Sequence, residues 1–448
     1  MSKAFYWSVL EFGVDVLSHE AGWMIGGYLR SNIAKKVRGE MSQVLKLMML
    51  RLLDHRDHSM LENGIVISTG DRPEDNFLVF IRVKIILADW AAWAGLFLLK
   101  SAAAIRFCMW CMNAVSERSQ LADIDTSGTL VSSACSDITE FIPQTDAGLR
   151  RCAQDLAGLC APPCTKKKQK QTETCFGMNH HPQNILLCAQ LEPYVNPCSM
   201  VCADWQHIYC VQGIANDELW MLIKTLKRNC RITMDDIHNF LRVWETPNHL
   251  KTKNPKTHLF DQKRQAAYLR ADSLKAGSSE LLFFYPIMMT FVHMLFSGIG
   301  AGARAGAMML ERASLSALCD VMNTLQCIPL GLVTPALLHA RIKRHFDAHK
   351  AAYDSENYFM RPKWHLSLHL SEHLRRFGTL LSCFTLERRH KALKLLARHT
   401  TNTRAFEKSC TIDMLLHHLG ELNRPDSLAR GTCLLEGLMF SLISVNEQ

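Results

Sequence analysis

The stretch from Leu281 to Gly302 constrains the fold most, because it contains no formally charged side chain. A run of this length either spans a bilayer or lies inside a large helical domain. Pro286, His293 and three glycines interrupt it, and no second span accompanies it. We therefore expect a buried helix, so that a membrane is not the expected partner. A membrane anchor through residues 281–302 stays the alternative.

The length of 448 residues and the hydrophobic content of 48% predict two or three domains with a sizeable core. The net charge of +9 permits a polyanionic partner without demanding one. Basic residues cluster at Lys166–Lys168, Arg341–His345 and Arg388–Arg398. Each cluster is equally consistent with an ordinary solvated face.

The 17 cysteines indicate a reducing compartment, because the N-terminal segment does not have the pattern of a signal peptide. Glu11 and Asp15 interrupt that segment, and no charged region precedes an apolar stretch. We expect a location in the nucleus or cytoplasm rather than secretion. Most cysteines should then be thiols or metal ligands instead of disulfides.

The hydrophobic pattern predicts how the elements follow one another. We expect a strand over 4–13, a helix over 18–53, and a hairpin of strands 64–69 and 77–88. Regular structure is sparse over 116–185, and helices dominate from 215 to 356 and from 362 to 445. The predicted domain boundaries are 1–115, 116–195, 196–355 and 356–448.

Three short patterns are candidates for chemistry. Asp89 follows an apolar strand, which suits a metal-binding or catalytic carboxylate but also a helix N-cap. Cys108 and Cys111 have the CxxC spacing of zinc ligands, although chance pairs are expected among 17 cysteines. Asp204 and His207 share one helix face. Asp235 and His238 have the same spacing, so this pattern is common.

The segment PKWHLSLHLSEHLRRFGTLLSCFTLERRHK, over 362–391, is the most informative part of the chain. His365 and His369 lie four residues apart, and Glu387 lies among cations. Such a density of positively charged side chains suits contact with phosphates, but an exposed basic helix with one internal salt bridge has the same composition. The candidate DNA-binding residues here are Arg375, Arg376, Arg388, Arg389, Lys391 and Lys394.

The order of these patterns resembles open reading frames related to the CACTA-type cut-and-paste DNA transposases. The resemblance is scattered over residues 4 to about 420 and is most specific over 361–409. It rests on AFYWSVLEFG (4–13), CMWCMNAV (108–115), DWQH (204–207), SSELLFFYPI (278–287), PKWHLSLHL (362–370), SCFTLERRHK (382–391) and NTRAFEKS (402–409).

The resemblance implies an α/β fold: an RNase H-like core interrupted by a large α-helical insertion, mostly α overall. In that family three acids hold two Mg²⁺ ions, which stabilise the attacking and leaving oxygens at a phosphodiester. By this resemblance Asp89 corresponds to the second acid and Glu387 to the third. Asp204 and His207 correspond to a supporting D-x-x-H element, and Cys108 and Cys111 to the family's CxxC.

The chain departs from the family pattern at three places. No acid precedes Glu11, so we expect the first catalytic acid and its strand to be missing. Lys100 is followed by Ser101 instead of glycine, and no DNA-end-binding finger precedes the core.

We therefore predict a transposase-derived protein with weak or no strand-transfer activity. DNA is its expected partner, with self-association as an option, and no small-molecule substrate is expected. A non-enzymatic helical nucleic-acid-binding or interaction protein is the alternative.

Overall fold

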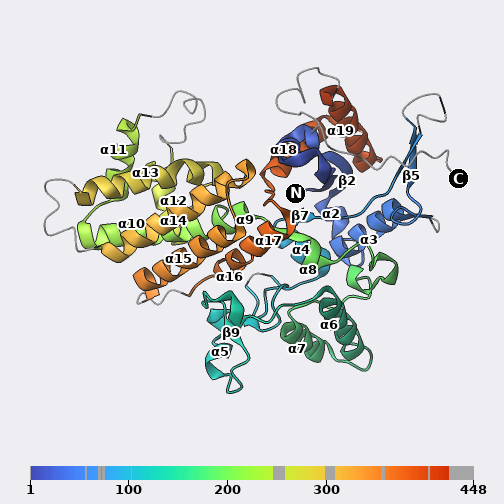
Figure 1. Cartoon of the computed structure of the whole chain (residues 1–448), viewed down its shortest axis with the longest axis horizontal. Coiled ribbons are helices and arrows are strands. Elements are labelled where there is room, and N and C mark those ends of the chain that lie inside the picture. The colour runs from blue at the N-terminus through green and yellow to red at the C-terminus, as the bar shows by residue number, and fades with distance from the viewer. Residues whose placement is uncertain are drawn as a thin grey trace. The chain divides into compact units, whose positions relative to one another are not determined.

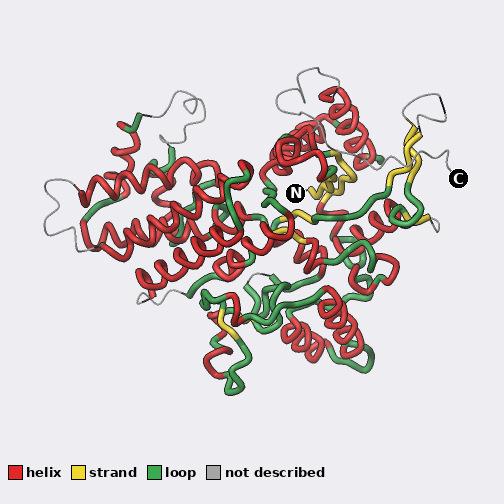
Figure 2. Tube along the Cα trace, viewed as in Figure 1, coloured by secondary structure: helices red, strands yellow, loops and turns green. Residues whose placement is uncertain are grey.

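The computed structural model describes residues 2–55, 58–68, 72, 76–101, 103–245, 258–297, 308–354, 359–401 and 404–422. The chain forms two compact units, each assembled from segments far apart in sequence. The first comprises residues 1–112, 143–202 and 381–448, and the second comprises residues 113–142 and 203–380. Most of the described chain is helical, and the strands are short (Figures 1 and 2).

The first unit begins with an antiparallel hairpin of β1 (Ser2–Trp7) and β2 (Met24–Arg30), with an irregular register between Phe5 and Tyr6. Between these strands lie α1 (Gly13–Ser18) and two 3-10 turns. The predicted helix over 18–53 is thus wrong for its first half, because Gly26 and Gly27 disfavour a helix and β1 supplies ladder partners. The second half is confirmed as α3 (Glu40–Leu53), preceded by the short α2 (Ser31–Ala34).

The predicted hairpin is confirmed as β5 (Ile65–Ser68), which pairs antiparallel with β6 (Asn76–Val79). Of the other two residues predicted for the first strand, Gly64 precedes β5 and Thr69 lies outside the described residues. The predicted second strand over 77–88 is wrong for residues 80–85, which form no strand. Its last part forms β7 (Ile86–Ala88), which pairs with β10 (Val201–Ala203). The helix α4 (Trp90–Phe97) follows β7. The two-residue strands β3 (Asp54–His55) and β4 (His58–Ser59) pair antiparallel with each other.

The segment predicted to be loop-rich contains two helices of the first unit. They are α6 (Asp146–Leu159) and α7 (Lys166–Phe176), and each begins at a threonine N-cap, Thr145 and Thr165. The short α8 (Pro197–Met200) precedes β10. Near the C-terminus, α18 (Phe384–His399) packs against α19 (Phe406–Leu422), and α19 also packs on β2.

The second unit is built mainly from helices that pack side by side (Figure 1). Each of its core helices contacts the next one along the chain. These helices are α10 (Ile214–Cys230), α13 (Ser278–Ser297), α14 (Met309–Cys327) and α15 (Pro335–Tyr353). The shorter helices are α5 (Leu121–Ile124), α9 (Trp205–Tyr209), α11 (Met234–Val243), α12 (Gln262–Ala271), α16 (Pro362–Leu368) and α17 (Leu370–Phe377). The strands β8 (Ala114–Val115) and β9 (Val131–Ser132) pair in parallel.

The apolar run forms α13, which packs against α10, α11 and α14. Its fully buried side chains include Leu281, Phe284 and Met288. Among the described residues, α13 alone is long and apolar enough to cross a bilayer, and 44% of its most apolar window is buried. Residues 298–302 of the alternative anchor lie outside the described residues. One face of α13 therefore contributes to the core of the second unit.

The fold is therefore mostly α overall, as expected, with small sheets. An RNase H-like core is not confirmed. Every sheet formed by the described residues has two strands, whereas the expected core carries its acids on one larger sheet.

Candidate functional site

Asp89 lies at the junction of β7 and α4 in the first unit. Its backbone is extended, and its carboxylate Oδ1 accepts a hydrogen bond from Ala92 N at 2.6 Å. This is the N-cap geometry that a strand–helix junction favours. The side chain therefore has a clear structural task at the N-terminus of α4.

Asp204 and His207 form the predicted pair in the second unit. Asp204 caps α9 through Gln206 N, and its Oδ2 lies 2.6 Å from His207 Nδ1. Asp204 is 4% exposed. The similarly spaced Asp235 instead accepts a bond from Gln265, and no hydrogen bond reaches His238 Nδ1 from the described residues. Spacing alone thus did not decide which pair would bond.

Lys363 holds the segment beyond Asp204 in place. Its Nζ donates to the carbonyls of His207 and Val211, both at 2.7 Å. Burial lowers the pKa of this lysine to about 8. The neighbourhood of Asp204 is accordingly a tightly bonded turn.

Glu387 lies in the first turn of α18 and is exposed, in the first unit. The neighbouring cations differ in environment. Arg388 donates to Glu20 at 2.9 Å and to Ser18 O at 3.1 Å. Arg389 is 1% exposed and donates to Glu421 at 2.5 Å. Of this pair, only Arg388 is exposed enough for a phosphate to approach.

The remaining candidate DNA-binding residues fall on two helices. Arg375 and Arg376 are exposed on α17 of the second unit, where both pair with Glu372. Lys391 and Lys394 are exposed on α18 of the first unit. The predicted set of six therefore does not form one surface of a single unit.

Cys108 and Cys111 lie in a tight turn of the first unit, where Trp110 N donates to Cys108 Sγ at 3.4 Å. Backbone N–H donation stabilises a thiolate, which is the form that binds zinc. Cys111 is buried, and its backbone forms an isolated antiparallel β-bridge with Pro143. Two thiolates fill half of a tetrahedral zinc shell.

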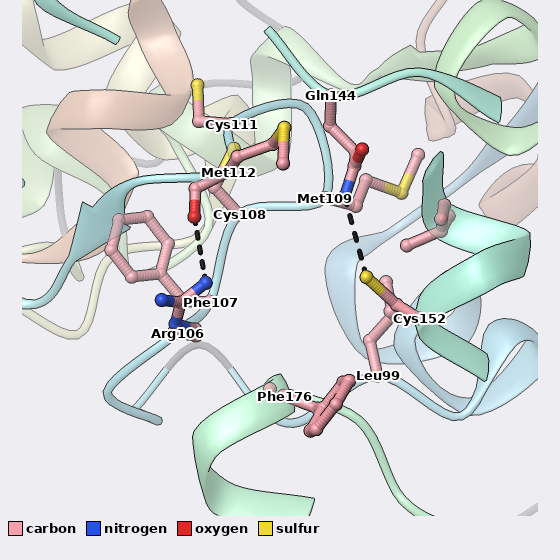
Figure 3. A pocket seen from close by; sticks show the side chains of 12 residues that line it. Leu99, Arg106, Phe107, Cys108, Met109, Cys111, Met112, Gln144, Cys152 and Phe176 are labelled. Carbon is pink, nitrogen blue, oxygen red and sulfur yellow. Dashed lines mark hydrogen bonds between the residues drawn. The ribbon is translucent and has the colours of Figure 1, made fainter. Parts of the chain in front are cut away.

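A small cavity of about 50 Å³ opens beside this turn (Figure 3). Cys108, Cys111 and Cys152 line it together with Met109, Met112, Arg106 and apolar residues. Burial raises the pKa of Cys152, whose nearby Asp155 acts in the same direction. Cys152 is therefore held as a neutral thiol.

His365 and His369 are buried in α16 and at the start of α17, in the second unit. Their Nε2 atoms lie 3.1 Å apart, and His373 Nδ1 accepts a bond from Ala203 N. Burial, helped by neighbouring His369, holds the pKa of His365 well below its usual value. Neutral imidazoles at this separation suit a transition metal. The four-residue spacing of the histidines was the available sequence signal for this pair.

The described residues thus include cysteine and histidine groups that could hold a metal ion, in weak agreement with zinc. Mg²⁺ has no such support. Neither Asp89 nor Glu387 belongs, within the described chain, to a group of three or more convergent ligands.

A second buried cluster of the second unit has no counterpart in the sequence predictions. Glu218 on α10 accepts a bond from Ser314 Oγ at 2.7 Å, and His345 Nε2 lies 2.5 Å from its Oε2. His349 Nδ1 is 3.5 Å from the same oxygen. Only the folding of α10, α14 and α15 brings these residues together.

Comparisons with protein-family models, with curated proteins and with solved structures found no match to this chain.

Proposed function

We propose that this chain is a transposase-derived DNA-binding protein whose strand-cleaving activity is weak or absent. The observation that carries the proposal is the exposed cationic face of α18. DNA presents a dense line of phosphates, and lysine and arginine side chains displace its counterions.

The α18 cationic face consists of Lys391, Lys394 and Arg398. All three are exposed, and no ion pair joins them to an acid among the described residues. Their spacing of three and four residues aligns them over about 10 Å of helix. The opposite face is buried through Thr385, Arg389 and Leu393. A helix anchored on one side and cationic on the other suits backbone contact with DNA.

A salt titration tests this role. We expect Lys391→Gln, Lys394→Gln and Arg398→Gln together to reduce the slope of log affinity against log salt by about 3, since each phosphate contact contributes about 0.9. Fluorescence anisotropy with a labelled duplex measures both slopes.

The matched control removes three charges from α7 instead. Lys166, Lys167 and Lys168 are exposed there, so their replacement by Gln changes the net charge equally. The control should keep the parental slope. If the slope fell equally in both variants, net charge alone would account for the change, and the proposed role of the α18 cationic face would be contradicted.

The catalytic part of the proposal concerns three acids. Asp89 and Asp204 both cap helices, and Glu387 lies on the basic helix. We propose Asp89 and Glu387 as the remnant Mg²⁺ ligands of an ancestral site, with Asp204 and His207 in support. Asp89→Asn and Glu387→Gln remove charge while keeping shape and, at position 89, an N-cap acceptor.

Nicking of a supercoiled plasmid in Mg²⁺ separates the enzymatic and non-enzymatic alternatives. Nicking that disappears in both variants would establish residual catalysis. Nicking that survives both substitutions would exclude these acids. DNA binding without nicking in the parental chain would favour a purely binding protein.

Zinc is the cofactor that we propose, with Cys108 and Cys111 as two of its ligands. The hydrogen bond from Trp110 N to Cys108 Sγ supports this assignment.

Membrane anchoring remains a rival, which carbonate extraction tests: recovery in the resistant pellet would favour an anchor through α13.

A further inference from the structure

Two thiols meet at the turn between α6 and α7 of the first unit, and these two helices pack against each other (Figure 1). Cys160 is the C-cap of α6, and Cys164 directly precedes Thr165, the N-cap of α7. The backbone N–H of Cys164 donates to Ala161 O at 3.0 Å and closes the turn. Because the helices on both sides are packed together, this short turn holds the two cysteines close to each other.

The side chains of Cys160 and Cys164 are hydrogen-bonded to each other. Cys164 Sγ also donates to Thr165 O at 3.6 Å. Pro162 and Pro163 restrict the backbone between the cysteines, which limits how far the thiols can separate. Rotation of the two side chains can therefore bring the sulfur atoms to the roughly 2 Å of a disulfide. Both cysteines are partly exposed, so a small solute can reach them.

A metal ion is not the expected occupant of this pair. Two thiolates fill only half of a tetrahedral zinc shell. Neither Cys160 nor Cys164 belongs, among the residues that the structure describes, to a group of three or more convergent ligands. In a reducing compartment, accessible thiols in contact are instead typical of redox-sensing pairs, which form transient disulfides.

We propose that Cys160 and Cys164 form a reversible disulfide when the protein meets a peroxide. The Cys164 thiolate attacks one oxygen of hydrogen peroxide, the O–O bond breaks, and the other oxygen leaves as hydroxide, which takes up a proton to give water. The Cys160 thiolate then attacks the sulfur of the Cys164 sulfenic acid. The S–S bond forms, the S–O bond breaks, and a second water leaves after protonation. The two thiols are oxidised to the disulfide, and the peroxide is reduced to two waters.

The surroundings of Cys160 decide which thiol reacts first. Burial raises the pKa of Cys160, and the neighbouring Cys164 and Glu173 act in the same direction. The thiolate, and not the thiol, is the form that attacks a peroxide. We therefore assign Cys164 as the attacking thiol and Cys160 as the resolving thiol.

Peptide mass spectrometry of the full-length chain tests the proposal. The protein is treated with hydrogen peroxide, alkylated with N-ethylmaleimide and cleaved with trypsin. The tryptic peptide 152–166 contains three cysteines, Cys152, Cys160 and Cys164. We expect peroxide to protect two of these three thiols from alkylation, and dithiothreitol to restore both.

Single variants assign the partners within this peptide. Cys152→Ser is the matched control, because Cys152 lies on the same peptide but lines the cavity beside α6. It should still form the disulfide. Cys160→Ser should stop at the sulfenic acid of Cys164, which dimedone labels, whereas Cys164→Ser should form neither product.

Three outcomes would contradict the proposal. The first is a parental peptide whose thiols all stay open to alkylation after peroxide. The second is protection that survives Cys160→Ser, because Cys152 would then be the partner of Cys164. The third is dimedone labelling of Cys160 in Cys164→Ser, which would overturn the assigned order of attack. DNA binding is measured separately, so each of these results leaves the α18 proposal intact.

Discussion

At the scale of residues, the Glu218 carboxylate is completely buried in the second unit. Burial by itself would raise the pKa of Glu218, but the charge of His345 and hydrogen bonds from His345 and His349 outweigh it and lower that pKa. The carboxylate is therefore ionised in the folded protein. Replacing it by glutamine leaves His345 without its buried partner, so we expect Glu218→Gln to lower the free energy of unfolding by about 3–5 kcal/mol.

The same shift predicts how stability depends on pH. Because the folded pKa lies below the ordinary value of 4.5, the contribution of Glu218 is present above that pH and is lost as pH falls below it. Urea unfolding at several pH values should show a shallower acid dependence in Glu218→Gln than in the parent. Glu372→Gln is the control, since its surface pairs contribute at most about 1 kcal/mol. An unchanged acid dependence in Glu218→Gln would contradict the assignment.

At the scale of elements, the junction of β7 and α4 depends on a single cap. Asp89→Ala removes the acceptor for Ala92 N, and we expect it to lower the free energy of unfolding by about 1 kcal/mol. Asp89→Asn keeps an acceptor and should cost much less. Thermal or denaturant unfolding of both variants measures the difference. Equal losses would show that the charge of Asp89, rather than capping, stabilises this junction.

At the scale of the whole molecule, zinc should contribute to stability. Because zinc binding is coupled to folding, we expect metal removal by a chelator to lower the melting temperature, and Cys108→Ser with Cys111→Ser to abolish the bound zinc. Elemental analysis of the purified protein measures the zinc content. Cys160→Ser with Cys164→Ser is the control, because these thiols flank a surface turn between α6 and α7.

The cobalt-substituted protein reports which ligands are present, because thiolate ligands give a charge-transfer band. The band should disappear in Cys108→Ser with Cys111→Ser. The same measurement on His365→Gln asks whether the buried imidazole pair of the second unit also binds metal. A parental protein that retains no zinc would contradict the proposed cofactor.

The sequence by itself determined features whose causes are local. β-branched residues and the polar turn between them specified the hairpin of β5 and β6, and helical periodicity specified α3. The uncharged apolar run specified α13. The position of Asp89 after an apolar strand indicated the N-cap as one of two options. Local signals were also present for α7, because Thr165 caps its N-terminus and Gly177 its C-terminus, but its polar sequence resembled a loop.

Only the tertiary structure decided which side chains are buried and with which partners. Met24–Arg30 became a strand because β1 pairs with it, and Arg389 became a structural residue because α19 brings Glu421 to it. Glu218 and His345 meet although 127 residues separate them in sequence. Burial sets the cost of an unpaired polar group, and that cost depends on contacts between distant segments. No local pattern encodes it.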